Sequence, residues 1–214
     1  MAEPTATSGS PPVGDEAAGL RAGAMAAMLA AGEVALLPTD TLPALAAQPA
    51  HAARIWSLKQ RPLEKPLILM GADLEQLVQF LGVAWREEWL EQALRCWPGP
   101  VTFVLPIVGV TTRLLNPTGE SLGLRVPACD AIRDVLRLSG PLATTSANCS
   151  GEPPALSRRE AVGRFPELPA LAAAAWSEGS GLASAVLAWR AHGDTGSWQT
   201  LRAGASKGSE SGHV

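Results

Sequence analysis

The chain has 214 residues, of which 47% are hydrophobic but only 5% are aromatic, with no tyrosine. This length suits one domain built around one aliphatic core. The formal net charge of −3 and the pI near 5.6 argue against a protein whose main role is binding nucleic-acid backbone, because such proteins usually carry a large positive excess. Cys96, Cys129 and Cys149 lack disulfide or C-x-x-C spacing, which predicts reduced thiols and a cytoplasmic location.

The two ends of the chain lack apolar periodicity. Residues 1–14 are rich in Ser, Thr, Pro and Gly, and residues 203–214 combine Gly, Ser and Lys, so both are predicted to be disordered tails of one domain at residues 15–202. The first basic residue is Arg21, so no secretory signal is expected. The longest apolar stretch is mostly alanine and is broken by Gly32 and Glu33, so no membrane span is expected either.

In chain order, the sequence predicts helices that alternate with strands. Residues 15–31 are predicted to be a helix, since acidic residues lie at the start and Gly32 stands where a C-cap belongs. Further helices are predicted at residues 50–58, 73–80, 86–96, 130–138 and 157–165. Strands are predicted at residues 34–37, 67–70, 101–107, 122–126, 141–145, 172–176, 183–189 and 198–202. The predicted fold class is α/β (α+β), with a twisted mixed sheet flanked by helices.

Three cations, Lys59, Arg61 and Lys65, lie within seven residues between a predicted helix and a predicted strand. Pro62 disfavours α geometry at Arg61, so Lys59 and Arg61 are expected on an extended segment, pointing the same way. Two cations on one side repel each other unless an anion neutralises them, and phosphate is the natural candidate. On the charges alone, a solvated basic loop is the simpler interpretation.

The predicted strand at residues 141–145 runs into a small polar turn that contains Ser146, Asn148 and Gly151. The two-residue spacing lets both polar side chains face one site, and small residues let backbone N–H groups approach a phosphate. Strand ends are also common positions for ligand-binding residues. An ordinary Ser/Asn-capped turn before a helix is the alternative interpretation.

Arg125 interrupts an apolar strand pattern. Its neighbours Leu122, Leu124 and Val126 alternate with Gly123 and Arg125, so the arginine is expected on the opposite face from the apolar side chains. The sequence leaves two surroundings open for it. One is solvent, and the other is a cleft in which the planar guanidinium could bind a substrate carboxylate through two parallel hydrogen bonds.

Five motifs together resemble the YrdC-like threonylcarbamoyl-adenylate synthase family. In chain order they are P-T-D-T at 38–41, K-x-R at 59–61, W-P-G-P-x-T at 97–102, R-x-P at 125–127 and S-x-N-x-S-G at 146–151. Their order and spacing cover residues 34–154, and L-R-x-G at residues 201–204 extends the match. The resemblance implies a YrdC-like fold whose twisted sheet has a concave, positively charged cleft.

The resemblance also implies an activity. L-threonine, bicarbonate and ATP would give L-threonylcarbamoyl-AMP and pyrophosphate, with Mg²⁺ accompanying the nucleotide. In the family, a separate tRNA threonylcarbamoyltransferase complex then uses this adenylate to modify the adenosine beside the anticodon. The reaction requires mainly positioning and neutralisation of negative charge, because two anionic reactants must meet.

Residue roles are carried over by matching positions in the family motifs. The positions that hold L-threonine in the family correspond to Thr41, Arg125, Thr144 and Ser184. Those that hold ATP correspond to Arg61, Lys65, Ser121, Ser146 and Arg202. The catalytic tetrad of the family corresponds to Lys59, Arg61, Ser146 and Asn148.

The chain departs from the family pattern at several of these motifs. Thr41 is followed by Leu-Pro-Ala-Leu where many members have Val-Tyr-Gly-Leu, and Met70 stands where some have a threonine-contacting histidine. Lys65 replaces a frequent asparagine, and Pro154 replaces a serine. Ser184 lies in a divergent form of the usual P-S-T-V strand. Selectivity for threonine over serine is therefore left open by the sequence.

The sequence also bears on three alternative functions. A module that binds double-stranded RNA or tRNA without catalysis would contact RNA weakly, and the acidic pI weighs against it. A carbamoyl-adenylate reaction like that of hydrogenase-maturation carbamoyltransferases would normally come with zinc-finger and acylphosphatase domains. A serine hydrolase is disfavoured because no G-x-S-x-G motif surrounds Ser146. The histidines and cysteines also lack zinc-ligand spacing, so no metal bound by protein side chains is predicted.

Overall fold

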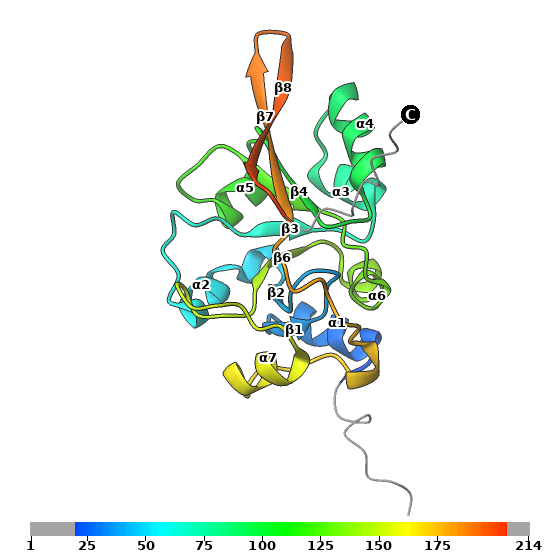
Figure 1. Cartoon of the computed structure of the whole chain (residues 1–214), viewed down its shortest axis with the longest axis vertical. Helices are drawn as coiled ribbons and strands as arrows, with labels where there is room; N and C mark the ends of the chain where they lie inside the picture. The colour runs from blue at the N-terminus through cyan, green and yellow to red at the C-terminus, as the bar shows by residue number, and fades with distance from the viewer. Residues whose placement is uncertain (1–19, 205–214) are drawn as a thin grey trace, which may run out of the picture.

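Eight strands form one mixed sheet in the computed structural model, which describes residues 20–204 (Figure 1). The spatial order is β1-β2-β6-β3-β5-β4-β7-β8. The β3–β5 and β4–β7 pairs are parallel, and the other neighbouring pairs are antiparallel. The strands are β1 (Ala35–Leu37), β2 (Ala44–Ala47), β3 (Ile68–Met70), β4 (Val101–Leu105), β5 (Leu122–Arg125), β6 (Leu142–Ser146), β7 (Ala185–His192) and β8 (Thr195–Arg202).

Helices connect most of these strands. The α-helices are α1 (Ala22–Ala30), α2 (Ala53–Lys59), α3 (Leu74–Leu81), α4 (Glu87–Cys96), α5 (Val110–Leu115), α6 (Asp130–Ser139) and α7 (Arg158–Arg164), and the 3-10 helices are η2 (Pro49–His51) and η3 (Ala173–Ala175). Side-chain caps fix two of the starts: Asp73 accepts from the backbone N–H of Gln76, and Ser157 accepts from that of Glu160. Gly82, in the left-handed region, ends α3.

The sheet has a buried core on each face, because successive strand side chains point to opposite sides. In β1, Leu36 belongs to one core cluster while Ala35 and Leu37 belong to the other. Helices α1 and α6 pack together against the second cluster through residues such as Met25 and Ile132. The first cluster lies under α2, α3, α4, α5 and α7.

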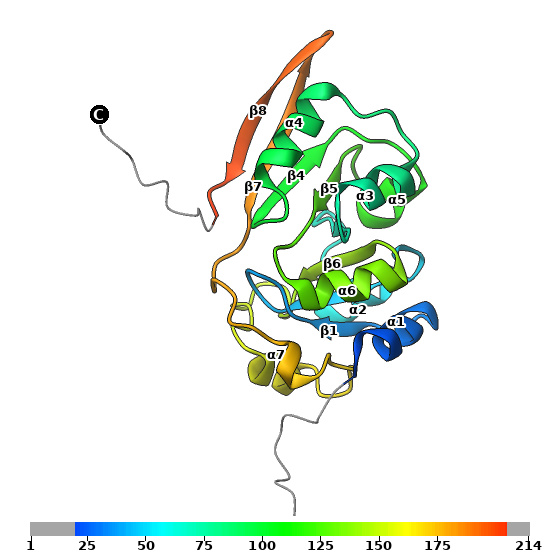
Figure 2. The same ribbon diagram turned by 90° about the vertical axis from the view of Figure 1, so that its right-hand side faces the viewer.

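A long hairpin of β7 and β8 projects from one end of the molecule (Figure 1), with α4 beside it (Figure 2). Its middle is held by aromatic contacts: Trp189 meets Trp89 of α4 and Trp198 of β8 edge to face, at centroid distances of 6.3 and 5.3 Å. Trp198 also packs on Phe103 of β4. The hairpin is therefore anchored to the body of the sheet before it extends outward.

Most predicted elements are confirmed, and the mixed sheet with flanking helices is confirmed as the fold class. The strand predicted at residues 172–176 is wrong, since this alanine-rich stretch forms η3. Strand β2 and helix α5 were not predicted at all. The tail at residues 1–14, the start of the first predicted helix up to residue 19, and residues 205–214 lie outside the described residues, whereas Ala203 and Gly204 are described.

The described part of the chain contains no helix long and apolar enough to cross a membrane. The helix over residues 22–30 is partly exposed on one side and spans only 9 residues. The alanine-rich stretch near the start of the chain therefore packs as a surface helix.

Candidate functional site

Strand register places many of the predicted site residues on one face of the sheet. Ala44 pairs with Ser146, Ile68 pairs with both Thr144 and Gly123, and Met70 pairs with Arg125. Paired residues share a face, and residues two apart along a strand share it as well. The residues that share this face are Ala44, Ala46, Ile68, Met70, Gly123, Arg125, Leu142, Thr144 and Ser146.

The same face continues across β4 and the hairpin. Thr102 pairs with Val186, which pairs with Arg202. Just before β7, the Ser184 hydroxyl lies 2.9 Å from that of Thr102. Arg202 donates from Nε to the Ser184 carbonyl at 3.0 Å, and burial lowers the pKa of its guanidinium. Ser184 and Arg202 are therefore held together at the base of the hairpin.

A cavity of about 200 Å³ opens on this face of the sheet. Seven of the predicted site residues line it, and they come from widely separated segments: Thr41, Arg61, Arg125, Thr144, Ser146, Ser184 and Arg202. Its other lining residues are Thr39, Leu42, Ala44, Pro66, Ile68, Met70, Thr145 and Ala183. The lining thus contains three arginines and no carboxylate, which suits anionic ligands. The wider concave, positively charged cleft remains a prediction.

Lys59 does not lie on an extended segment, so that expectation was wrong. Helix α2 ends at Lys59, and Gln60 takes the left-handed conformation with φ 48°. The Lys59 side chain is fully buried. Its ammonium donates to the Ser146 carbonyl at 2.5 Å, to the Asn148 carbonyl, and to Asn148 Oδ1 at 3.2 Å. Lys59 therefore supports the turn at residues 146–148 from behind.

The electrostatics of Lys59 differ from those of an ordinary surface lysine. Burial, followed by the nearby positive charge of Arg61, lowers the pKa of its ammonium from 10.5 to about 8. The charges of Lys59 and Arg61 are therefore close enough to interact. Their side chains do not face the same site, however, since only Arg61 lines the cavity. Because the pKa lies near neutrality, the charge of Lys59 responds to pH in a range where enzymes work.

Arg61 lines the cavity at the start of a tight loop. Its Nε donates to the Lys65 carbonyl at 2.9 Å, and its Nη2 donates to the Pro66 carbonyl at 3.1 Å. Burial lowers the pKa of its guanidinium. Lys65 is exposed, its ammonium lies 3.5 Å from the Ser150 hydroxyl, and it does not line the cavity. The loop thus directs Arg61, but not Lys65, toward the site.

The polar turn after β6 is held by its own side chains. Ser146 Oγ donates to Asn148 Oδ1 at 2.6 Å, and Asn148 Nδ2 donates to the carbonyls of Cys149 and Glu152, both at 2.8 Å. The two predicted side chains therefore meet, but only Ser146 lines the cavity. Ser121 also lies outside the lining, and its carbonyl accepts from Asn116 Nδ2 at 2.8 Å.

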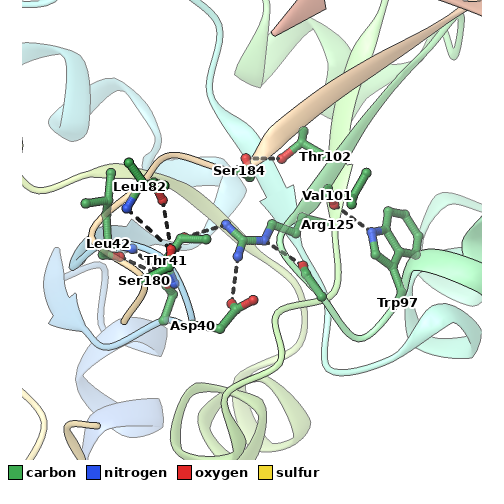
Figure 3. A network of polar contacts seen from close by, with 12 residues as sticks. Asp40, Thr41, Leu42, Trp97, Val101, Thr102, Arg125, Ser180, Leu182 and Ser184 are labelled. Carbon is green, nitrogen blue, oxygen red and sulfur yellow. Dashed lines mark hydrogen bonds and ion pairs between the residues drawn. The ribbon is translucent and has the colours of Figure 1, made fainter. Parts of the chain in front are cut away.

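Arg125 is buried rather than solvated, and it lines the cavity. Its guanidinium donates from Nη2 to Asp40 Oδ1 at 2.6 Å, from Nη1 to Thr41 Oγ1 at 2.9 Å and from Nε to the Gly99 carbonyl at 3.2 Å (Figure 3). Burial lowers the pKa of Arg125, while the carboxylate of Asp40 acts in the opposite direction. The arginine is thus held in one orientation at the cavity wall.

The loop that carries Thr41 is built around Thr39. Thr39 Oγ1 donates to the Leu42 carbonyl at 2.7 Å and accepts from the backbone N–H groups of Thr41 and Leu42. It also lies 3.0 Å from Thr41 Oγ1. The segment at residues 179–181 is tied to the same loop, since Ser180 donates to the Asp40 carbonyl and Gly181 to the Thr41 carbonyl. Such side-chain turns fix a loop without regular structure.

Sequence reasoning missed Asp40 and Thr39 as parts of the site. Both belong to the P-T-D-T motif that carried the resemblance, so the motif was an available signal. The ion pair of Asp40 with Arg125 joins residues 85 positions apart, and local spacing could not reveal it. Met70 was noted only as a departure from the family, yet its side chain lines the cavity.

A second and larger cavity, of about 600 Å³, lies across the loop at residues 38–43. It is bounded by α7, by that loop and by the segment at residues 176–179. None of the predicted site residues lines it. Among residues 20–204, no group of three or more His, Cys, Asp or Glu side chains is placed to bind a metal ion.

The fold and the cavity define an α/β protein with a cavity on one face of its sheet that is lined by three arginines. The Sua5/YciO/YrdC family, described as "Telomere recombination", matches residues 27–204. The chain therefore belongs to the Sua5/YciO/YrdC family. The match covers both the cavity and the hairpin.

Solved structures agree with this assignment. P. abyssi Sua5 complexed with L-threonine is 30% identical with a TM-score of 0.76, and the match covers 86% of this chain and 54% of that one. This chain thus spans about half the length of the Sua5 structures that it matches. E. coli YciO shares the fold at 22% identity, with a TM-score of 0.69 and coverage of 86% and 89%.

A more distant match extends the comparison. Full-length HypF in a phosphate- and nucleotide-bound form shares the fold at 17% identity and a TM-score of 0.65, with coverage of 86% of this chain and 29% of that one. At this identity the similarity concerns the fold alone. The same fold thus occurs both as most of a chain, in YciO, and as part of a much longer one, in HypF.

Proposed function

We propose that this protein is an L-threonylcarbamoyladenylate synthase, which joins L-threonine, bicarbonate and ATP into L-threonylcarbamoyl-AMP and pyrophosphate. One observation carries the proposal: seven residues matched from the family motifs line a single cavity although they come from segments far apart in the chain. Family membership and the similarity to a Sua5 structure that contains L-threonine support it.

The amino acid would occupy the part of the cavity around Arg125. A substrate carboxylate would bind the guanidinium, while the hydroxyls of Thr41, Thr144 and Ser184 supply further hydrogen bonds. All four groups are buried by more than nine-tenths, so the ligand would be largely removed from water. Arg125 would therefore act as the anchor for the amino acid.

The phosphates of ATP would lie toward Arg61, Ser146 and Arg202. The cavity, at about 200 Å³, is smaller than the roughly 300–1,000 Å³ of typical ligand pockets. It suits an amino acid and phosphate groups, so the rest of the nucleotide would extend outside it. The lining offers no carboxylate, so Mg²⁺ would arrive as part of the substrate, held by the phosphates.

The reaction needs the site to bring negative groups together. The threonine amine and bicarbonate condense to a carbamate with loss of water, and a carbamate oxygen then attacks the α-phosphorus and displaces pyrophosphate. Arg61 and Arg202 would neutralise the charge that builds up on the phosphates. Lys59 would hold the turn that presents Ser146, through its bonds to the carbonyls of Ser146 and Asn148.

In the cell, the adenylate would pass to a separate tRNA threonylcarbamoyltransferase complex.

The direct test uses purified protein with ATP, bicarbonate and each amino acid in turn. Pyrophosphate release is followed while mass spectrometry detects the adenylate. The proposal predicts that threonine gives the fastest release and a threonylcarbamoyl-AMP mass. It fails if no amino acid stimulates pyrophosphate release in a protein shown to be folded.

A further inference from the structure

A buried ion pair stands directly behind the wall of the cavity. Asp40 Oδ1 lies 2.6 Å from Arg125 Nη2, and the two side chains are only 12% and 4% exposed. Arg125 lines the cavity, but Asp40 does not. Asp40 therefore contacts the residue that faces the ligand without facing the ligand itself.

We propose that Asp40 is a positioning residue, which holds the Arg125 guanidinium in the orientation that binds the carboxylate of the amino-acid substrate. This role rests on the proposed function, since it assigns that carboxylate to Arg125. Asp40 would not touch the substrate. Its effect would pass entirely through the direction and the charge of Arg125.

The geometry of the guanidinium supports this role. Arginine carries five N–H donors in a rigid plane. Gly99, Thr41 and Asp40 each accept one of them, from Nε, Nη1 and Nη2 respectively. Three acceptors fix the plane of the group and leave one N–H on each Nη atom. These two donors are free to hydrogen-bond a substrate carboxylate.

The backbone around Asp40 is held in place by hydrogen bonds, so its carboxylate has a fixed position from which to orient Arg125. Its backbone carbonyl accepts from Ser180, and the following residue is held by Thr39 Oγ1 (Figure 3). Within the described residues, Asp40 Oδ2 is buried and has no hydrogen-bond partner. A carboxylate with one oxygen unpartnered is a costly group to bury.

The charge of Asp40 matters as well as its shape. Burial acts to lower the pKa of Arg125, and Arg202 adds a smaller effect in the same direction. The Asp40 carboxylate opposes both effects through its charge and its hydrogen bond. Without it, the guanidinium would lose both its strongest partner and its main compensating charge. It would then be free to turn toward another anion in the cavity, such as a phosphate.

The first part of the test needs no ligand. The Arg125 Nε–H signal is followed by ¹⁵N NMR, assigned by its loss in Arg125→Lys, and its hydrogen exchange is measured. In Asp40→Asn this exchange should be at least about tenfold faster, because the guanidinium is less constrained. Asp134→Asn is the matched control, since Asp134 pairs with Arg137 on the surface and should leave the exchange unchanged. Unaltered exchange in Asp40→Asn would overturn the proposal.

The second part measures binding of L-threonine and of ATP by calorimetry. Asp40→Asn should raise the Kd for threonine at least about tenfold and change that for ATP less than about threefold. Asp40→Glu, which keeps the carboxylate, should restore the threonine Kd to within about threefold of wild type. If Asp40→Asn raised the Kd for threonine and the Kd for ATP equally, Asp40 would have only a structural role. The same conclusion would follow if Asp40→Glu bound threonine as weakly as Asp40→Asn.

An unstable variant and a failure of the proposed function give different results. If Asp40→Asn melts below the assay temperature, Asp40→Ser carries the same comparison, because its smaller side chain leaves room for a water beside Arg125. If the wild-type protein binds no threonine and forms no adenylate, the proposed function fails. The exchange of the Arg125 Nε–H still decides whether Asp40 orients the guanidinium.

Discussion

Replacing Lys59 by methionine removes both the hydrogen bonds that support the turn and the positive charge. Methionine has a similar length and no donors, so the carbonyls of Ser146 and Asn148 would lose the ammonium that they accept from. Each buried acceptor left unpaired costs about 1–3 kcal/mol. Removing a buried ammonium recovers part of that cost. At pH 7 we expect a net loss of about 2 kcal/mol in the free energy of unfolding.

The pH dependence makes this prediction sharper. The pKa of Lys59 is about 8 in the folded protein, against 10.5 as its ordinary value. Between those values the unfolded chain binds more protons than the folded one, so the stability of the wild type rises with pH across this window. The variant lacks this contribution. The destabilisation caused by Lys59→Met should therefore grow between pH 8 and 10.5.

The size of this growth follows from the same two values. The interval from 10.5 to about 8 sets an upper limit of about 3.5 kcal/mol, since one pKa unit corresponds to about 1.4 kcal/mol. Screening by solvent reduces this limit, so a growth of about 1–2 kcal/mol is expected. Urea unfolding at pH 7, 9 and 10, followed by tryptophan fluorescence, measures it.

The control for this experiment is Lys65→Met, which removes an exposed lysine from the next loop. It should change stability by less than about 0.5 kcal/mol at each pH. A destabilisation by Lys59→Met that stays flat or shrinks as pH rises would refute the reasoning, because the folded pKa could then not lie below 10.5. Threonine-dependent pyrophosphate release should be lost in Lys59→Met at every pH.

Three other variants test the cavity. Arg61→Ala should slow pyrophosphate release at least about a hundredfold, because a cation beside the phosphates is lost; near-normal turnover in steady-state kinetics would remove Arg61 from the site. Arg125→Ala should raise the KM for threonine more than that for ATP, and should cost about 3 kcal/mol in urea unfolding because Asp40 loses its partner. Equal changes in both KM values would count against a carboxylate anchor. Gly179→Ala should weaken threonine binding severalfold in calorimetry, since an added Cβ would lie 2.4 Å from the Thr41 carbonyl; an unchanged Kd would show that this segment does not support the site.

The part of the site that lies on strands could be predicted from the sequence. A period of two placed Arg125 opposite Leu122 and Leu124, and the structure confirms that division between cavity and core. The same rule predicted that Ser146 and Asn148 face one site, but β6 ends at Ser146 and only Ser146 lines the cavity. Their direct hydrogen bond arises within the turn, which is why a local pattern could find it.

The expectation for Lys59 failed for an identifiable reason. Pro62 restricts the residue before it, Arg61, and says nothing about residues further back. Helix α2 continues to Lys59, and a non-glycine residue in the left-handed conformation, Gln60, then reverses the chain. Left-handed glutamine is uncommon, so no local signal marks it. The two cations consequently take different positions.

Strand β2 and the Asp40 pair show what local sequence cannot reveal. The strand is only Ala-Leu-Ala-Ala, with weak β propensity, and it forms because β1 and β6 hydrogen-bond to it on both sides. The alanines at residues 173–175 lack such neighbours and form a 3-10 turn instead. Both outcomes depend on long-range partners, as does the ion pair between Asp40 and Arg125.

The end of β8 has a practical consequence for experiments on this protein. Gly204 packs so closely on Ala185 that an added Cβ would lie 1.9 Å from its nitrogen, and Arg202 bonds to Ser184 at the rim of the cavity. A fusion partner or affinity tag joined directly after Gly204 would begin beside the cavity. At the other end of the described residues, Leu20 pairs with Leu171. A fluorophore attached next to Gly204 would therefore report on events at the rim of the cavity.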